Sequence, residues 1–184
     1  MFISGKVRFK LNTPQLSLLS PKEQKLLKPT PEAIAAEVLS EDMQKDVAKL
    51  CDCIRANNLR IKWVGKNGWE VSARKTQILR RIRINPAENN WYVTLHFFQQ
   101  YNDYLTDEEI HNFVWNNLGG MGCDALNTGG PKCKGYMSKT FNMFGKMCEN
   151  QCCNSQIKIM SPTEKALEHT KTLILTARDI ANAL

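Results

Sequence analysis

Cysteines and glycines gather in one part of the chain, and thiolates are among the side chains best suited to bind zinc. Five of the seven cysteines lie within 123–153, and seven of the ten glycines lie within 119–145. A metal can stabilise a glycine-rich segment that is costly to order, and a closed zinc site needs four ligands in a tetrahedron. The candidate zinc ligands are Cys123, Cys133, Cys148 and Cys152, with Cys153 as an alternative to Cys152.

The cysteine spacing leaves other roles open. Nine, fourteen and three residues separate the four candidate ligands, which is not the spacing of two CxxC knuckles. A reactive or disulfide-forming thiol pair is a second interpretation, because nearby lysines would lower the pKa of a thiol. Inert packing is a third, because free cysteine is among the most buried residue types. An odd number of cysteines favours reduced thiols.

Positive charge gathers in a second region. The chain has a formal net charge of +7, and residues 60–83 contain eight Lys and Arg against a single acid, Glu70. That stretch accounts for the whole net charge, and the remainder of the chain is balanced. Guanidinium groups bind phosphate and carboxylate through paired hydrogen bonds. This charge pattern therefore predicts an anionic small molecule or an acidic protein as partner.

Alternation along the strands expected in this region divides the side chains between two faces. Apolar residues such as Trp69 and Val71 fall on one face, and arginines with polar residues fall on the other. The side chains expected to contact an anionic ligand are Arg74, Arg81, Arg83, Tyr92 and His96.

Three interpretations of these basic strands remain. The face is solvated, as the outer faces of half-buried sheets commonly are, or it binds an anion or acidic partner. In the third interpretation it binds single-stranded nucleic acid, whose bases would stack on Tyr92, His96 and Phe98. The chain contains no RNP1, zinc-finger or helix-turn-helix motif. The ligand therefore stays unnamed.

The expected elements are those of an α+β fold. Strands are expected at 60–64, 69–75, 77–84 and 91–98, with 2–10 and 156–160 as possible additions. The sequence Lys66-Asn67-Gly68 indicates a tight hairpin between the first two. Capping residues predict helices after Ser20, Thr30, Ser40, Thr106 and Ser161.

These elements predict an antiparallel β-meander of four or more strands packed on helices, with N-terminal helices and a long C-terminal helix. Residues 1–40 would form an arm with short helices, and 41–184 a single α+β domain that includes the Gly/Cys-rich segment 119–153. The expected core residues are Trp69, Val71, Ile82, Ile84, Trp91, Val93 and Leu95 on the strands and Val47, Leu50, Phe113, Leu173 and Ile174 on the helices.

A resemblance adds to this interpretation. Residues 68–75, the basic strand and turn that follow, the strand at 91–98 and the closing helix at 164–174 resemble certain short bacterial proteins known only as domains of unknown function. Those proteins are distantly similar to YdhG-like domains, which resemble the frataxin fold. The resemblance implies a meander packed on helices, and no catalytic residue carries over from it. The N-terminal arm and the cysteine-rich segment depart from the shorter pattern.

Several classes of function find little support. The segment from Gly130 to Gly135 is followed by Tyr136 and Met137, where a phosphate-binding loop needs Lys and Ser or Thr. The three histidines have no local partner that would indicate a catalytic pair. No apolar run approaches the ~20 residues of a membrane span, and no signal peptide is apparent. We expect a cytoplasmic binding or accessory domain, with a zinc-stabilised module as the alternative and a thiol-dependent enzyme third.

Overall fold

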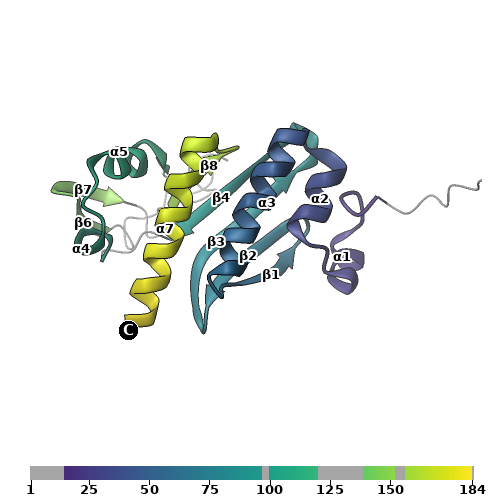
Figure 1. Cartoon of the computed structure of the whole chain (residues 1–184), viewed down its shortest axis with the longest axis horizontal. Coiled ribbons are helices and arrows are strands. Elements are labelled where there is room, and N and C mark those ends of the chain that lie inside the picture. Colours follow the sequence, from purple (N-terminus) through teal and green to yellow (C-terminus); the bar gives the residue numbers. More distant parts are fainter. Residues whose placement is uncertain (1–14, 97–99, 120–138, 152–155, 184) are drawn as a thin grey trace, which may run out of the picture.

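The computed structural model of the chain describes residues 15–96, 100–119, 139–151 and 156–183. These residues form an α+β fold, as the sequence predicts: helices lie against a twisted antiparallel sheet (Figure 1). The sheet has six strands in the order β1-β2-β3-β4-β8-β5, and a separate hairpin pairs β6 with β7. The strands are β1 (Arg60–Gly65), β2 (Gly68–Ala73), β3 (Thr76–Asn85), β4 (Asn90–His96), β5 (Leu118–Gly119), β6 (Lys139–Met143), β7 (Lys146–Gln151) and β8 (Gln156–Met160).

Two-residue turns join the first three strands. Gly65 pairs with Gly68, so only two residues separate β1 from β2, and one of them, Asn67, has a φ of 50°. Ala73 pairs with Thr76 in the same way, and Arg74 between them also has a φ of 50°. Such left-handed residues match the twist of a tight hairpin. The predicted strand at 69–75 therefore ends earlier, and Arg74 belongs to a turn rather than to a strand face.

Helices α2 (Pro31–Val38), α3 (Glu41–Ala56) and α7 (Glu164–Ala183) cover one face of the sheet. Figure 1 shows α3 and α7 side by side across the strands. Their apolar stripes meet the apolar sides of β2, β3 and β4 in one core cluster. The expected core is confirmed: all the named strand residues, and Val47, Leu50, Leu173 and Ile174, are buried, whereas Phe113 is only half-buried.

The helix starts follow the predicted caps in three cases and differ in two. Ser20, Thr30 and Ser40 directly precede α1 (Pro21–Leu27), α2 and α3. In α5 (Glu108–Asn117) the cap is Asp107 rather than Thr106, because the Asp107 carboxylate accepts the backbone N–H of Glu109 at 2.8 Å. Helix α7 begins at Glu164, three residues after Ser161, whose backbone N–H donates to the Trp91 carbonyl at 2.7 Å.

Part of the fold has no counterpart in the predicted elements. Helix α4 (Tyr101–Tyr104), strand β5 and the β6–β7 hairpin are additional, whereas the possible strand at 156–160 is confirmed as β8. The hairpin packs through Met143, which is fully buried, and through Phe144, whose ring stacks on His111 at 3.9 Å. The possible strand at 2–10 lies outside the described residues. Of the described helices, none combines the length and the apolar character that crossing a bilayer requires.

Candidate functional site

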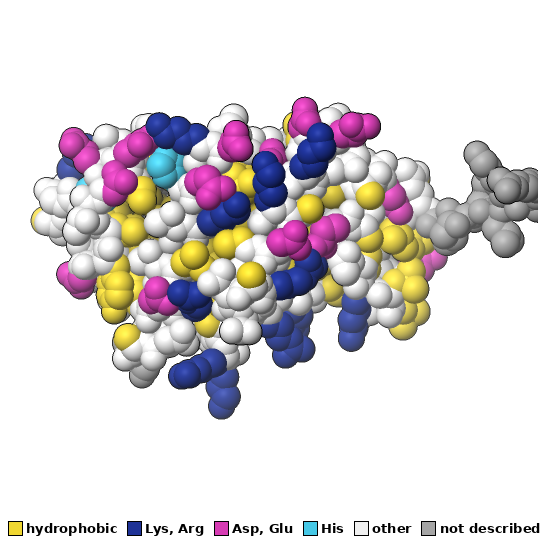
Figure 2. All heavy atoms as spheres, in the orientation of Figure 1, with side chains coloured by type: hydrophobic (Ala, Val, Ile, Leu, Met, Phe, Trp, Pro, Cys, Tyr) yellow, Lys and Arg dark blue, Asp and Glu magenta, His cyan; other side chains and the backbone are white. Residues whose placement is uncertain are grey.

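The sheet face opposite α2, α3 and α7 is rich in cations, and we call it the basic face. Pairing places Lys62 beside Glu70, Arg83 between Gly68 and Tyr92, and Lys158 beside Thr94. The helical side differs from it, because acidic and basic side chains are intermixed there (Figure 2). The basic face consists of Arg60, Lys62, Glu70, Ser72, Gln77, Arg81, Arg83, Tyr92, Thr94, His96 and Lys158.

Arg81 and Arg83 lie at the centre of the basic face and converge over Gly68. A β-carbon added at Gly68 would lie 3.6 Å from Nη1 of Arg83 and 3.7 Å from Cδ of Arg81. The missing side chain in β2 therefore leaves space for two arginines to lie along the sheet. Both are half-buried, and within the described part of the chain neither forms an ion pair. Their charge is available to a ligand.

Glu70, the single acid of the basic face, is already engaged elsewhere. Its carboxylate accepts from Nζ of Lys62 at 3.1 Å and from Nε2 of Gln77 at 3.0 Å. The Glu70 side chain is only 23% exposed, so these contacts occupy both of its oxygens in a partly desolvated position. Glu70 therefore balances the charge of Lys62 rather than that of the two central arginines.

Tyr92 and Thr94 present less open surface than the sequence suggests. Nζ of Lys158 lies 4.6 Å from the centroid of the Tyr92 ring, within cation–π range. A base that stacks on this face of the Tyr92 ring would have to displace the lysine. Thr94 is only 3% exposed, and the register places it between two longer side chains, Arg81 and Lys158. The contact of Lys158 with Tyr92 favours recognition of anionic groups over stacking of bases.

His96 contributes polarity rather than charge to the basic face. Its Nε2 lies 2.9 Å from Oε1 of Gln77. Burial lowers the pKa of the His96 imidazole below its ordinary value, and the positive charge of Arg80 lowers it further. The ring is therefore neutral near pH 7 and adds no positive charge to the face at that pH.

Four of the five predicted ligand-binding residues share the basic face, and Arg74 does not. Arg74 lines a hollow at the β2–β3 turn together with Arg178 and Asp179 of α7. Its left-handed backbone, which the sequence pattern did not reveal, carries it off the strand. Sequence reasoning also missed Lys158 as a site residue. The alternation of Gln156, Lys158 and Met160 along a possible strand was the available signal.

The predicted zinc ligands cannot be placed. Cys123, Cys133 and Cys152 lie outside the described residues, as does Cys153, and Cys148 lies in β7 with a side chain that is not described. Within the described ranges, no group of three or more His, Cys, Asp or Glu side chains is arranged to hold a metal ion. The zinc site therefore stays a prediction.

Neither of the two cysteines whose side chains are described, Cys51 and Cys53, has the properties of a reactive thiol. Cys51 is buried in the α3 stripe, as expected, and burial raises the pKa of its thiol, with the Glu32 carboxylate adding to the effect. Cys53 is half-buried, and burial raises the pKa of its thiol too. Because the thiolate is the nucleophile, both are poorly suited to catalysis.

No family model, curated protein or solved structure matches the chain. The likeness to YdhG-like domains therefore stays a prediction, and the functional argument rests on the geometry of the basic face.

Proposed function

We propose that this chain is a binding domain that holds an anionic partner on the basic face, with Arg81 and Arg83 as the principal contacts. The observation that carries the proposal is the convergence of these two arginines over Gly68 without a carboxylate partner in the described part of the chain. Like charges so close together are unfavourable until an anion relieves their repulsion. A phosphate or carboxylate would also occupy the paired donors of each guanidinium.

The spacing of the arginines favours a partner with more than one anionic group. Residues two apart on a strand have Cα atoms about 7 Å apart. Arg81 and Arg83 on β3 thus present two anion-binding groups about 7 Å apart along the strand. Lys158 on β8 adds a third cation two strands away, with β4 between them. A polyanion, or an acidic protein segment, can contact several of these cations at once. Binding of this kind relies on electrostatic complementarity and is sensitive to salt.

The experiment compares two double variants that remove the same amount of charge. In Arg81→Gln/Arg83→Gln the loss falls at the centre of the basic face, whereas in Arg74→Gln/Lys75→Gln it falls in the β2–β3 turn. Each protein is eluted from heparin with a salt gradient, and thermal unfolding verifies that both variants fold. We expect the central variant to elute at clearly lower salt than the wild type and the turn variant to elute close to it.

Equal shifts in the two variants would contradict the proposal, because they would show that retention follows net charge rather than the basic face. If the central variant eluted at the same salt concentration as the wild type, the basic face would be a solvated surface and not a binding site. Retention itself is expected to weaken steeply with salt, since bound anions release counterions.

A further inference from the structure

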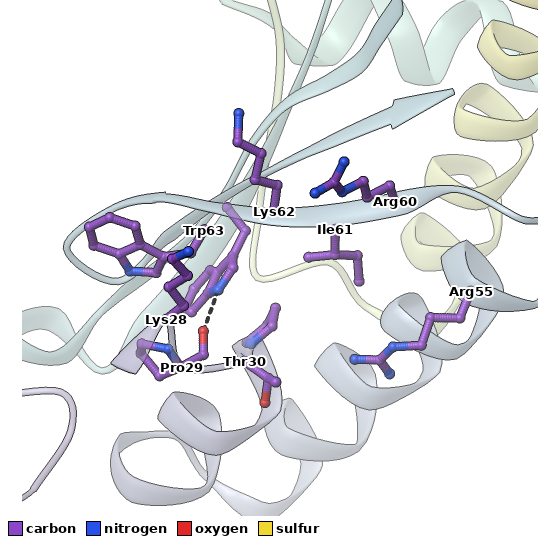
Figure 3. Close-up of a pocket in the computed structure, with 10 residues that line it drawn as sticks. Lys28, Pro29, Thr30, Arg55, Arg60, Ile61, Lys62 and Trp63 are labelled. Atoms are coloured by element: carbon purple, nitrogen blue, oxygen red, sulfur yellow. Dashed lines mark hydrogen bonds between the residues drawn. The ribbon is translucent and has the colours of Figure 1, made fainter. Parts of the chain in front are cut away.

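A second candidate site lies at the opposite edge of the molecule from β5, where β1 forms one edge of the six-stranded sheet. A cleft of about 440 Å³ opens between β1 and the linker 28–30 that joins α1 to α2. This volume falls within the roughly 300–1,000 Å³ typical of small-molecule sites. Figure 3 shows the cleft with Ile61 of β1 above it and Pro29 and Thr30 of the linker below.

The linker is fixed against the sheet by hydrogen bonds, so the cleft is built into the fold. The indole N–H of Trp69 donates to the Pro29 carbonyl at 2.7 Å (Figure 3). Lys28 ends α1 in a left-handed conformation, with a φ of 47°, and its N–H donates to the Gln24 carbonyl. Gln24 in turn holds Asn67 of the β1–β2 turn through two hydrogen bonds. The two walls therefore keep a fixed separation.

Apolar and aromatic residues make up about half of the cleft lining. Ile61 and Trp63 are two residues apart on β1, so their side chains share one side of the strand. In Figure 3, Ile61 points toward the linker, while Lys62 between them points away. Pro29 and the buried Trp69 complete this surface. A flat ring would find apolar contacts on both sides here.

Charged side chains with no ion-pair partner in the described part of the chain also line the cleft. The indole N–H of Trp63 has no acceptor there either, but it is hidden from solvent and is not offered to a ligand. Trp91 and Trp115 share this property, but neither lines this cleft. Lys28 and Arg60 line the cleft without forming an ion pair among the described residues.

Arg55, by contrast, is already neutralised. Its Nη1 lies 2.5 Å from Oε1 of Glu32 and 3.6 Å from Oδ1 of Asp52. The positive charge available to a ligand in the cleft therefore comes from Lys28 and Arg60, at the Trp63 end and the upper rim in Figure 3.

We propose that this cleft binds a small aromatic anion, a planar ring that carries a phosphate or a carboxylate. The ring packs between Ile61 and Pro29, beside the Trp63 indole, and the anionic group is attracted by Lys28 and Arg60. The ring-binding surface is separate from the centre of the basic face, because Ile61 and Trp63 lie on the other side of β1 from Lys62. Arg60 and Lys62 belong to the basic face and also line the cleft.

The test titrates the full chain, labelled with nitrogen-15, with phenyl phosphate and follows the indole N–H resonances of its four tryptophans. We expect a saturable shift that is largest for Trp63. Benzoate reports whether a carboxylate serves as well as a phosphate. Inorganic phosphate lacks the ring, and benzyl alcohol lacks the anionic group. Each should bind at least about tenfold more weakly than phenyl phosphate, because one of the two kinds of contact is missing.

Matched variants separate this site from the basic face. Lys28→Met removes an exposed charge at the cleft and should weaken phenyl phosphate binding severalfold. Arg81→Gln/Arg83→Gln should leave the titration unchanged while it reduces heparin retention. The proposal is overturned if Trp63 shows no saturable shift, if benzyl alcohol binds as well as phenyl phosphate, or if only the Arg81→Gln/Arg83→Gln variant weakens binding.

Discussion

Asn67 combines a left-handed backbone with a buried side chain that joins two segments. It is 3% exposed, and its φ of 50° places it in the region that Asn and Gly tolerate best. Its Oδ1 accepts from Nε2 of Gln24 at 2.7 Å, and its Nδ2 donates to the Ser17 carbonyl at 3.3 Å. One residue therefore shapes the β1–β2 turn and anchors the N-terminal arm.

Substitution of Asn67 should separate these two effects. Asn67→Gly keeps the turn but removes the side-chain hydrogen bonds, so we expect a loss of about 1–3 kcal/mol in the free energy of unfolding. Asn67→Ala removes the same bonds and, unlike Asn67→Gly, keeps a β-carbon in the left-handed conformation, which should cost about 1 kcal/mol more than Asn67→Gly. Urea denaturation of the two variants measures the difference. Equal stability would show that the turn conformation contributes little.

His96 should make the fold less stable at mildly acidic pH. Because burial lowers its pKa, the folded state takes up a proton less readily than the unfolded state, whose imidazole titrates near 6.5. Stability is therefore complete above that pH and decreases as the pH falls below it. His96→Gln should reduce the slope of stability against pH between 5 and 7 by up to about 1.4 kcal/mol per unit. Urea midpoints across this range provide the measurement, and parallel slopes for the two proteins would contradict it.

The residue scale is also where prediction from sequence was least secure. Alternation assigned Arg81, Arg83 and Tyr92 to one face correctly, because one side of each strand must be apolar to meet the helices. It misplaced Arg74, since a turn and a strand end are indistinguishable when no Gly or Asn marks the left-handed residue. Alternation also gave no indication that Gly68 leaves space for Arg81 and Arg83, because that space depends on the pairing of β2 with β3.

At the scale of elements, the N-terminal arm is held by a small set of polar contacts. The carboxylate of Glu37 in α2 accepts the backbone N–H groups of Leu16 and Ser17 at 2.9 and 2.8 Å. Gln24 of α1 bonds to Asn67 and to the Leu16 carbonyl. In contrast, Leu26 and Leu27 of α1 are exposed, by 85% and 58%. Polar anchoring therefore replaces much of the apolar packing that holds the other helices.

Removing an anchor should release the arm without unfolding the domain. Gln24→Ala loses three hydrogen bonds, two of them to Asn67. We expect faster trypsin cleavage at the lysines of α1 and an indole signal of Trp69 that changes as the linker loosens. Leu26→Ala, at an 85% exposed position of the same helix, leaves every lysine in place and is the control for a general effect on α1. A Gln24→Ala protein as resistant as the wild type would contradict this anchoring role.

Sequence analysis missed the β6–β7 hairpin and β5, because the hairpin turn has an unusual sequence and β5 is very short. The β6–β7 hairpin reverses at Phe144 and Gly145, with φ of 49° and 76°, and Phe is not a typical residue for the first position. The Phe144 N–H donates to Oδ1 of Asn102 at 2.7 Å, so a distant residue helps to fix this turn. Strand β5 has two residues, too few for any alternation to be visible. Tertiary contacts, rather than local preference, define both.

At the scale of the whole molecule, one apolar core joins the sheet to α7. Leu173 and Ile174 at the middle of α7 are fully buried, and α7 contacts both β2 and β3 as well as α3. The fold class could be predicted from the sequence, because the apolar residues repeat every second position in the strands and every 3.6 residues in the helices. Both patterns are long, and the two kinds of element must bury their apolar sides in one core. The sheet order was not predictable, since β8 returns to β4 after a long intervening segment.

Truncation in α7 should therefore destabilise the molecule as a unit. Ile174→Ala is expected to lower the free energy of unfolding by about 2–5 kcal/mol. Circular dichroism and tryptophan fluorescence should report the same lowered midpoint, because the helix and the sheet unfold together. Asn182→Ala, at an exposed position near the end of α7, should change stability by no more than about 0.5 kcal/mol. Separate transitions for the two probes would show that α7 docks independently of the sheet.

The place of β8 in the sheet has a consequence for synthesis on the ribosome. Strands β1 to β4 leave the ribosome in order and can pair at once, but β4 receives its second neighbour only when Gln156–Met160 has been made. Helix α7, which covers β2 and β3, follows later still. At about 5–20 residues per second, the nascent chain spends several seconds with β4 as an unpaired edge. That interval is when the growing protein is most open to aggregation and to capture by chaperones.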